Sequence, residues 1–127
     1  MNNAKIENVK SLSSENRLGY FLRKVADFER VWGGYGDDGW LHLSTEKGDK
    51  LFPLWPEEEF SIDYNTNHQY QFSPKEIDLY YFLDKWIPGL EKDHINILIF
   101  PVDKGNGTVI SPCDLKKLLE DELEQYE

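Results

Sequence analysis

The chain of 127 residues contains a single cysteine, Cys113, and no apolar run long enough to cross a membrane. One cysteine excludes an internal disulfide and is typical of proteins in a reducing compartment. The longest apolar stretch, INILIF, is interrupted by Asn96 and is much shorter than the roughly 18 residues of a membrane span. The first ten residues lack the apolar segment that a signal peptide requires. We therefore expect a cytoplasmic protein with no membrane association.

Positive charge is also scarce. The chain has 14 Lys and Arg residues against 24 Asp and Glu residues, so its formal net charge is −10. Nucleic acids and anionic lipids are bound by clustered cations, and the densest grouping here is a sparse one, formed by Arg17, Arg23, Lys24 and Arg30. The composition therefore disfavours a nucleic-acid-binding role and would suit a protein partner of basic character.

Apolar residues spaced three or four apart predict helices within residues 13–32, 76–93 and 111–127. Pro56 and the acidic residues after it predict another helix, the second in chain order, within residues 56–64. Ser13 and Ser111 stand at capping positions in front of the first and last of these helices. Pro88 and Gly89 are expected to end the third helix.

Strands are predicted in two groups, within residues 32–55 and 94–110. The segments GGYGDDG, TEKGDK and DKGNG are typical of the turns between paired strands. Alternation places Trp40 and His42 on one face of their strand and Leu41 on the other. Pro53 confines its strand to an edge or a bulge, and residues 65–75 are expected to form a polar loop.

The predicted order of elements is α-βββ-α-α-ββ-α. Strands that come as hairpins favour the α+β class, with an antiparallel or mixed sheet of about five strands and helices packed against it. Residues 1–10 are expected to form a loosely ordered N-terminal tail, and residues 11–127 a single α+β domain.

No motif assigns a catalytic residue, a metal ligand or a cofactor. His42, His68 and His94 stand alone in different predicted elements, whereas zinc ligands usually come in closely spaced pairs. The DKGNGTVI segment fails the spacing of a calcium-binding loop in both registers that we tested. Cys113 lies in the first turn of a predicted helix, but Asp114 opposes a lowered thiol pKa, and a small buried thiol is the usual case. We predict no metal and no cofactor, and we favour a protein without enzymatic activity.

The stretch LFPLWPEEEF, residues 51–60, places Trp55 between two prolines. Such a segment can be a rigid corner between a strand and a helix, because proline is favoured in the first helical turn. It can also be an exposed interface anchor, because a fixed aromatic side chain loses little entropy on binding. If a partner binds here, the candidate contact residues are Tyr35, Trp40, Pro53, Trp55, Pro56 and Glu57.

Several blocks of the chain resemble a family of small bacterial proteins, the domain of unknown function 2750. The blocks are YFLRKVADFERVWG, DDGW, FPLWPEEEF, FLDKWIPGLEKD, ILIFP and LLEDELEQYE, and they cover the chain from about Leu12 onward. Residues 61–72 are more polar than the resemblance leads us to expect. The resemblance implies a stand-alone cytoplasmic bacterial protein with PLWP as its hallmark, and it brings no catalytic residue.

The leading functional hypothesis is a non-enzymatic protein-interaction module with an aromatic, acid-rimmed surface around Trp40 and Trp55. Its unidentified partner would be a basic protein, for example a toxin or nuclease that an inhibitor or immunity protein neutralises. One alternative is a small metal-dependent hydrolase that combines His42 or His94 with nearby carboxylates. Another is a homodimer or larger homo-oligomer in which the aromatic patch is the contact between subunits.

Overall fold

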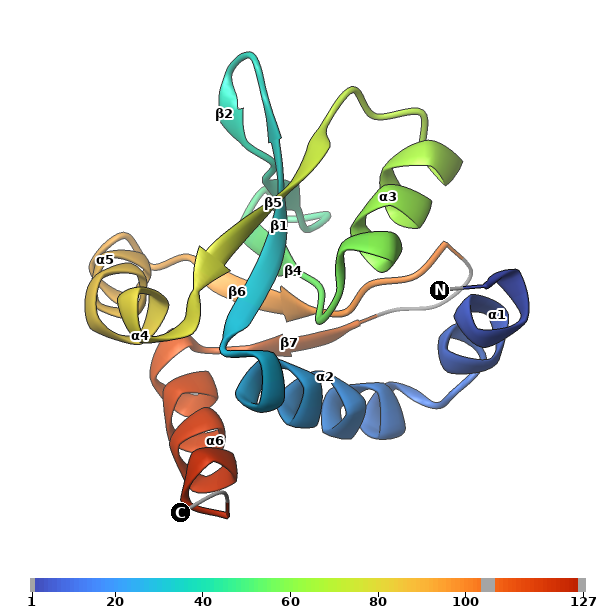
Figure 1. Cartoon of the computed structure of the whole chain (residues 1–127). Coiled ribbons are helices and arrows are strands. Elements are labelled where there is room, and N and C mark those ends of the chain that lie inside the picture. Colours follow the sequence, from blue (N-terminus) through green and yellow to red (C-terminus); the bar gives the residue numbers. More distant parts are fainter. Residues whose placement is uncertain (1, 104–106, 126–127) are drawn as a thin grey trace.

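The computed structural model describes residues 2–103 and 107–125 of the chain (Figure 1). Its helices are α1 (Asn3–Lys10), α2 (Ser14–Phe28), α3 (Glu58–Asn67), a composite helix and α6 (Pro112–Glu124). The composite helix consists of α4 (Leu79–Tyr81), the π-helical turn η1 (Phe82–Trp86) and α5 (Ile87–Lys92). The strands are β1 (Arg30–Gly36), β2 (Gly39–Trp40), β3 (Leu43–Ser44), β4 (Lys50–Leu54), β5 (Ser73–Asp78), β6 (Asn96–Ile99) and β7 (Thr108–Ile110). The predicted α+β class is confirmed.

The strands form two sheets, where the sequence predicted one. The first has the order β2-β1-β5 and is antiparallel. The second has the order β3-β4-β6-β7, with β4 and β6 parallel and the other pairs antiparallel. A bridge between Trp32 and Trp55 connects the two sheets through backbone hydrogen bonds of 3.0 and 2.8 Å.

The core lies where the helices cover these sheets. Helix α3 packs against β1 and β5, while α6 packs against both α2 and α5. Figure 1 shows α3 on one side of the first sheet and the composite helix on the other. The largest fully buried side chains are Trp55, Phe21, Phe52, Phe60, Phe82 and Phe100. Within the described residues, no helix combines the length and apolar character needed to cross a membrane.

Both predicted serine caps are confirmed. The Ser13 hydroxyl accepts a hydrogen bond from Asn16 N at 3.1 Å, and the Ser111 hydroxyl accepts one from Asp114 N, also at 3.1 Å. Each satisfies a backbone donor that the first turn of its helix would otherwise leave unpaired. Helix α2 nevertheless ends at Phe28 and not near Trp32, because Glu29 adopts a left-handed conformation and the chain continues as β1.

The predicted polar loop and the start of the third helix are wrong. Residues 73–78 form β5, which pairs with β1 from Ser73↔Tyr35 to Asp78↔Arg30.

The predicted end of the third helix is also wrong, because the helix continues past Pro88 and Gly89 to Lys92. The π-helical turn makes this possible. Ile87 N donates to Phe82 O five residues back, so the widened turn lies directly before the proline, which has no N–H to donate.

Two further predictions need revision. Pro53 does not lie in an edge strand, because β4 has β3 on one side and β6 on the other. Its pairing with β3 involves only Lys50 and Leu51, however, so Pro53 is paired on the β6 side alone. At the N-terminus, residues 3–10 form a helix where the sequence predicted a loosely ordered tail. Of the DKGNG turn, residues 104–106 lie outside the described part of the chain.

Candidate functional site

A cleft of about 580 Å³ lies between the two sheets and the composite helix. Its walls come from β2, β4, β5, the composite helix and the segment leading to β6. The lining residues are Trp40, His42, Phe52, Glu76, Ile77, Asp78, Tyr81, Lys85, Trp86, Gly89, Leu90, Asp93 and Ile95. Aromatic rings and carboxylates thus dominate the lining, in a volume typical of small-ligand or side-chain binding sites.

Three rings pack against one another to form the aromatic wall of this cleft. The centroids of Trp40 and Trp86 are 5.0 Å apart in an edge-to-face arrangement. Phe52 lies 5.2 Å from Trp86 and 6.0 Å from Trp40. Phe52 is buried, while the two tryptophans are half-buried, so part of each indole remains accessible. Because each ring is supported by the other two, little side-chain entropy would be lost when a ligand binds.

The glycines of β1 make room for this wall. A Cβ atom on Gly33 would lie 3.1 Å from two ring atoms of Trp40. The sequence predicted that the GGYGDDG glycines form a turn, but Gly33 and Gly34 lie inside β1, and the turn is confined to Asp37 and Asp38. The missing side chain at Gly33 therefore serves the close approach of the indole.

The other wall is acidic. Glu76, Asp78 and Asp93 contribute three carboxylates to the lining, against the single ammonium group of Lys85. Asp78 also caps α4, because its Oδ2 accepts a hydrogen bond from Tyr81 N at 3.0 Å. Lys85 is mostly exposed and lies 3.7 Å from Asp84. The cleft therefore combines aromatic faces with an excess of negative charge.

A second groove, of about 370 Å³, adjoins the cleft and shares Glu76 with it. It is lined by Phe28, Arg30, Trp32, Pro56, Glu57, Glu58, Glu59 and Glu76. Arg30 lies inside this groove. One of its guanidinium nitrogens is 3.2 Å from Glu76 Oε2, and its guanidinium carbon lies 5.9 Å from the ring centre of Phe28 and 6.0 Å from that of Trp32.

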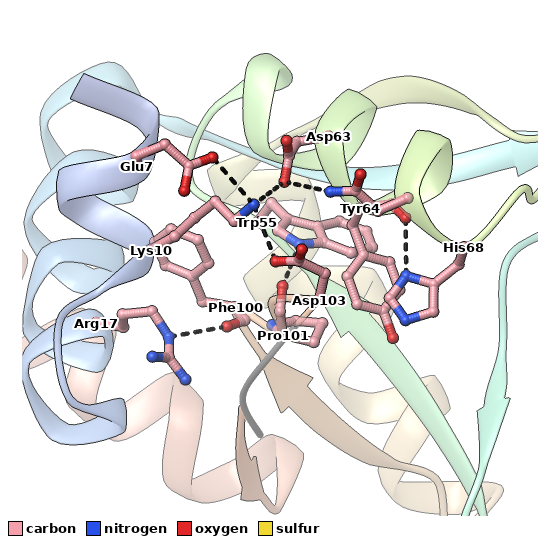
Figure 2. A network of polar contacts seen from close by, with 11 residues as sticks. Glu7, Lys10, Arg17, Trp55, Asp63, Tyr64, His68, Phe100, Pro101 and Asp103 are labelled. Atoms are coloured by element: carbon pink, nitrogen blue, oxygen red, sulfur yellow. Dashed lines mark hydrogen bonds and ion pairs between the residues drawn. The ribbon is translucent and has the colours of Figure 1, made fainter. Parts of the chain in front are cut away.

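The structure places the PLWP residues in the core. Trp55 is 0% exposed, and Pro53 and Pro56 are also buried. Trp55 Nε1 donates a hydrogen bond to Pro101 O at 3.0 Å (Figure 2). The segment is thus the corner between β4 and α3, which was the structural alternative for LFPLWPEEEF. In this conformation its tryptophan cannot contact a partner.

Of the remaining candidates, Tyr35 and Trp40 lie side by side, whereas Glu57 lines a different groove. Tyr35 is 39% exposed and packs edge-to-face on Trp40 with 5.2 Å between ring centres. Lys75 lies over both rings, 4.0 Å from the centre of Tyr35 and 5.5 Å from that of Trp40. Glu57 lines the second groove, and its carboxylate accepts a hydrogen bond from the Tyr20 hydroxyl. Of the six candidates, Trp40 alone lines the main cleft.

The histidines do not converge. His42 lines the cleft and packs 5.4 Å from Phe52; partial burial of the imidazole, and then the charge of Lys50, lower the pKa of His42. His68 packs against both Tyr64 and Tyr70, while His94 is exposed outside the cleft. Among the described residues, no group of three or more His, Cys, Asp and Glu side chains could hold a metal ion. The metal-dependent hydrolase alternative therefore gains no ligand set from this part of the chain.

Cys113 is exposed, where the sequence predicted a buried thiol. Its interaction with Glu91, followed by desolvation and by the charge of Asp114, raises the pKa of the thiol. A raised pKa lowers the thiolate fraction, so nothing here activates Cys113 as a nucleophile.

Sequence reasoning missed the acidic wall and two of the three rings of the aromatic wall. Glu76 and Asp78 were assigned to a helix, and Trp86 was taken as part of a helical apolar stripe. The alternation of Glu76, Ile77, Asp78 and Leu79 is the signal that could have identified the strand, since Ile77 and Leu79 are buried and the two acids are exposed.

Comparison with known proteins connects this arrangement to one family. Neither the curated proteins nor the solved structures contain a match to the chain. The model of the family described as "Protein of unknown function (DUF2750)" matches residues 18–119. This region includes the whole lining of the cleft and of the second groove. Because the match covers most of the chain, this protein belongs to the DUF2750 family.

Proposed function

We propose that this protein is a non-enzymatic binding module whose main cleft holds a basic side chain of a protein partner. The observation that carries the proposal is the joint presence of the Trp40–Phe52–Trp86 wall and the three carboxylates in one cleft. A cation gains energy over an aromatic face, about 0.5–2 kcal/mol according to its desolvation. Carboxylates close to that face would add charge pairing to the same ligand.

The overall charge supports a basic partner. The net charge of −10 attracts basic proteins over a long range and increases their rate of association. An inhibitor or immunity protein that neutralises a basic toxin or nuclease is one concrete form of such a module. The lining of the cleft, as far as the chain is described, contains no serine, threonine or cysteine that could act as a nucleophile.

The proposal predicts that a cationic peptide binds in the cleft. The probe is a fluorescein-labelled peptide of alternating glycine and arginine, measured by fluorescence anisotropy. Asp93→Asn removes one exposed carboxylate of the lining and is expected to weaken binding by about three- to fivefold, the value of a partly screened charge pair. Trp86→Leu removes an aromatic face and is expected to weaken binding by roughly five- to tenfold.

The control is Glu120→Gln, which removes the same charge from an exposed position of α6 outside the cleft. It should change the affinity by less than about twofold, because a screened charge acts only over roughly 8–10 Å. Melting curves must show that each variant is folded. Equal effects of Asp93→Asn and Glu120→Gln would mean that the peptide binds to the general negative charge, and the proposal would be wrong. Self-association that Trp86→Leu abolishes would instead make the cleft a contact between copies of the chain.

A further inference from the structure

The second groove already contains the interaction that we propose for a partner. Arg30 places its guanidinium between Phe28 and Trp32 and pairs it with Glu76. It does so on a surface with three further glutamates, Glu57, Glu58 and Glu59. The chain's own arginine thus shows which ligand chemistry this groove accepts, a guanidinium over aromatic faces with a carboxylate at its edge.

Glu76 lines both the cleft and the groove, so the two meet at this residue, and together they are called the trough. Phe28 is 47% exposed, which is unusual for a phenylalanine, and its ring is approached by both Lys24 and Arg30, at 5.6 and 5.9 Å from the ring centre. The side chains of Arg30 and Glu76 are 47% and 53% exposed, respectively. A pair this exposed contributes little to stability. A ligand can therefore displace Arg30 without unfolding any element.

From this geometry we infer that the trough binds an arginine-bearing segment of a basic protein, with one cationic side chain in the cleft and an arginine in the groove, where it displaces Arg30 from Glu76. Arg30 is then an internal competitor that lowers the affinity for the partner. This inference rests on the proposed function and adds the second cation, the preference for arginine and the role of Arg30.

Charge complementarity supports this occupant over the others. A second copy of this chain would bring a net charge of −10 to an acidic trough, and like charges oppose such an association. Lysine would fit the groove less well than arginine, because the guanidinium is planar, can stack on both rings and can bind a carboxylate through two nitrogens.

The test compares Arg30→Ala with a matched control. Lys117→Ala removes the same charge from an exposed position of α6 that lines neither the cleft nor the groove. The probes are labelled glycine-rich peptides with two arginines, or with one arginine and one citrulline, which keeps the shape but not the charge. For the two-arginine peptide, Arg30→Ala should raise the affinity about fivefold, since it removes an exposed pair worth up to about 1 kcal/mol, and Lys117→Ala by less than about twofold.

The gain should depend on the second arginine and on Glu76. With the citrulline peptide, Arg30→Ala should give no more gain than Lys117→Ala. The double variant Arg30→Ala/Glu76→Gln should lose the gain with the two-arginine peptide. If Arg30→Ala matches Lys117→Ala or weakens binding, Arg30 is not a competitor and the inference is wrong, while an effect of Asp93→Asn would still support the proposed function. If no arginine peptide binds the wild type or Arg30→Ala, both are wrong.

Discussion

Replacing Trp55 by alanine is expected to destabilise the protein by about 3–5 kcal/mol, the usual cost of truncating a fully buried ring. The side chain is 0% exposed and packs against Tyr64 with 5.3 Å between ring centres. Its Nε1–H also satisfies Pro101 O in the buried segment after β6. The loss is a large part of the 5–15 kcal/mol that stabilises a typical domain. Urea unfolding followed by circular dichroism would measure it.

Two further variants separate the contributions. Trp55→Phe keeps a ring but leaves Pro101 O without its donor, and an unsatisfied buried polar group costs about 1–3 kcal/mol. Trp86→Ala truncates the same residue type at a half-buried position and should cost less than Trp55→Ala, because less apolar area is lost. A loss below about 1 kcal/mol for Trp55→Ala would contradict the core position of Trp55.

Trp55→Phe also tests the division between architecture and binding. Trp55 contributes nothing to the lining of the cleft or the second groove, so this variant should bind the arginine peptide with unchanged affinity while it unfolds at lower denaturant concentration. PLWP would then be a structural corner of this chain, and the binding residues would lie elsewhere, on β2, β4, β5 and the composite helix.

The sequence predicted the elements whose signals are local. Helix α2 has a serine cap and an apolar stripe, and the buried positions Phe21 and Val25 follow that stripe. Strand β5 has only a short local signal, the alternation from Glu76 to Leu79, and Ile77 is its only buried residue. It is a strand because six of its residues pair with β1. Partners so distant in the chain cannot be identified from periodicity, so a polar strand of this kind is read as a loop.

The candidate site was predicted only in part, because some of its residues meet through contacts between distant segments of the chain. Trp40 could be placed with His42 on one face by simple alternation, and both line the cleft. Trp86 lies on a helix far along the chain and meets Trp40 only through the packing of the composite helix on the sheets. The sequence left Trp55 open between a core corner and an interface anchor, because two prolines indicate a rigid backbone but do not indicate which side of that backbone faces solvent.

Ion pairs of Lys10 explain why helix α1 is fixed against the rest of the protein. Figure 2 shows its ammonium group among the carboxylates of Asp63 on α3, Asp103 after β6 and Glu7 on α1. The distances to Asp63 and Asp103 are 2.7 and 2.9 Å, and the lysine side chain is only 8% exposed. These ion pairs join α1 to two distant segments. No periodic pattern within residues 1–10 could reveal them.

We expect Lys10→Met to destabilise the protein by about 2–3 kcal/mol, because it leaves two facing carboxylates without their counter-ion. The value lies below that of a fully buried pair, since Asp63 and Asp103 are each 25% exposed and keep some contact with water. Lys5→Met removes the same charge from an exposed position of the same helix and should cost less than about 0.5 kcal/mol. A double-mutant cycle with Asp63→Asn should give a coupling of about 0.5–3 kcal/mol.

The pH dependence provides an independent test of the Lys10 network. Burial alone would lower the pKa of Lys10, but hydrogen bonds to Asp63 and Asp103 and their charges outweigh burial and raise it above its ordinary value. A lysine whose pKa is raised by folding contributes stability that is fully present below the unfolded pKa of about 10.4 and is lost as the pH rises above it. The difference in unfolding free energy between wild type and Lys10→Met should therefore be constant from about pH 7 to 10 and shrink toward pH 11.5. Burial and the Glu57 hydrogen bond raise the pKa of Tyr20 as well, so wild type and variant share that alkaline loss and it cancels in the difference. A difference that stayed constant up to pH 11.5, or a cost equal to that of Lys5→Met, would show that the ammonium group does not hold α1 in place.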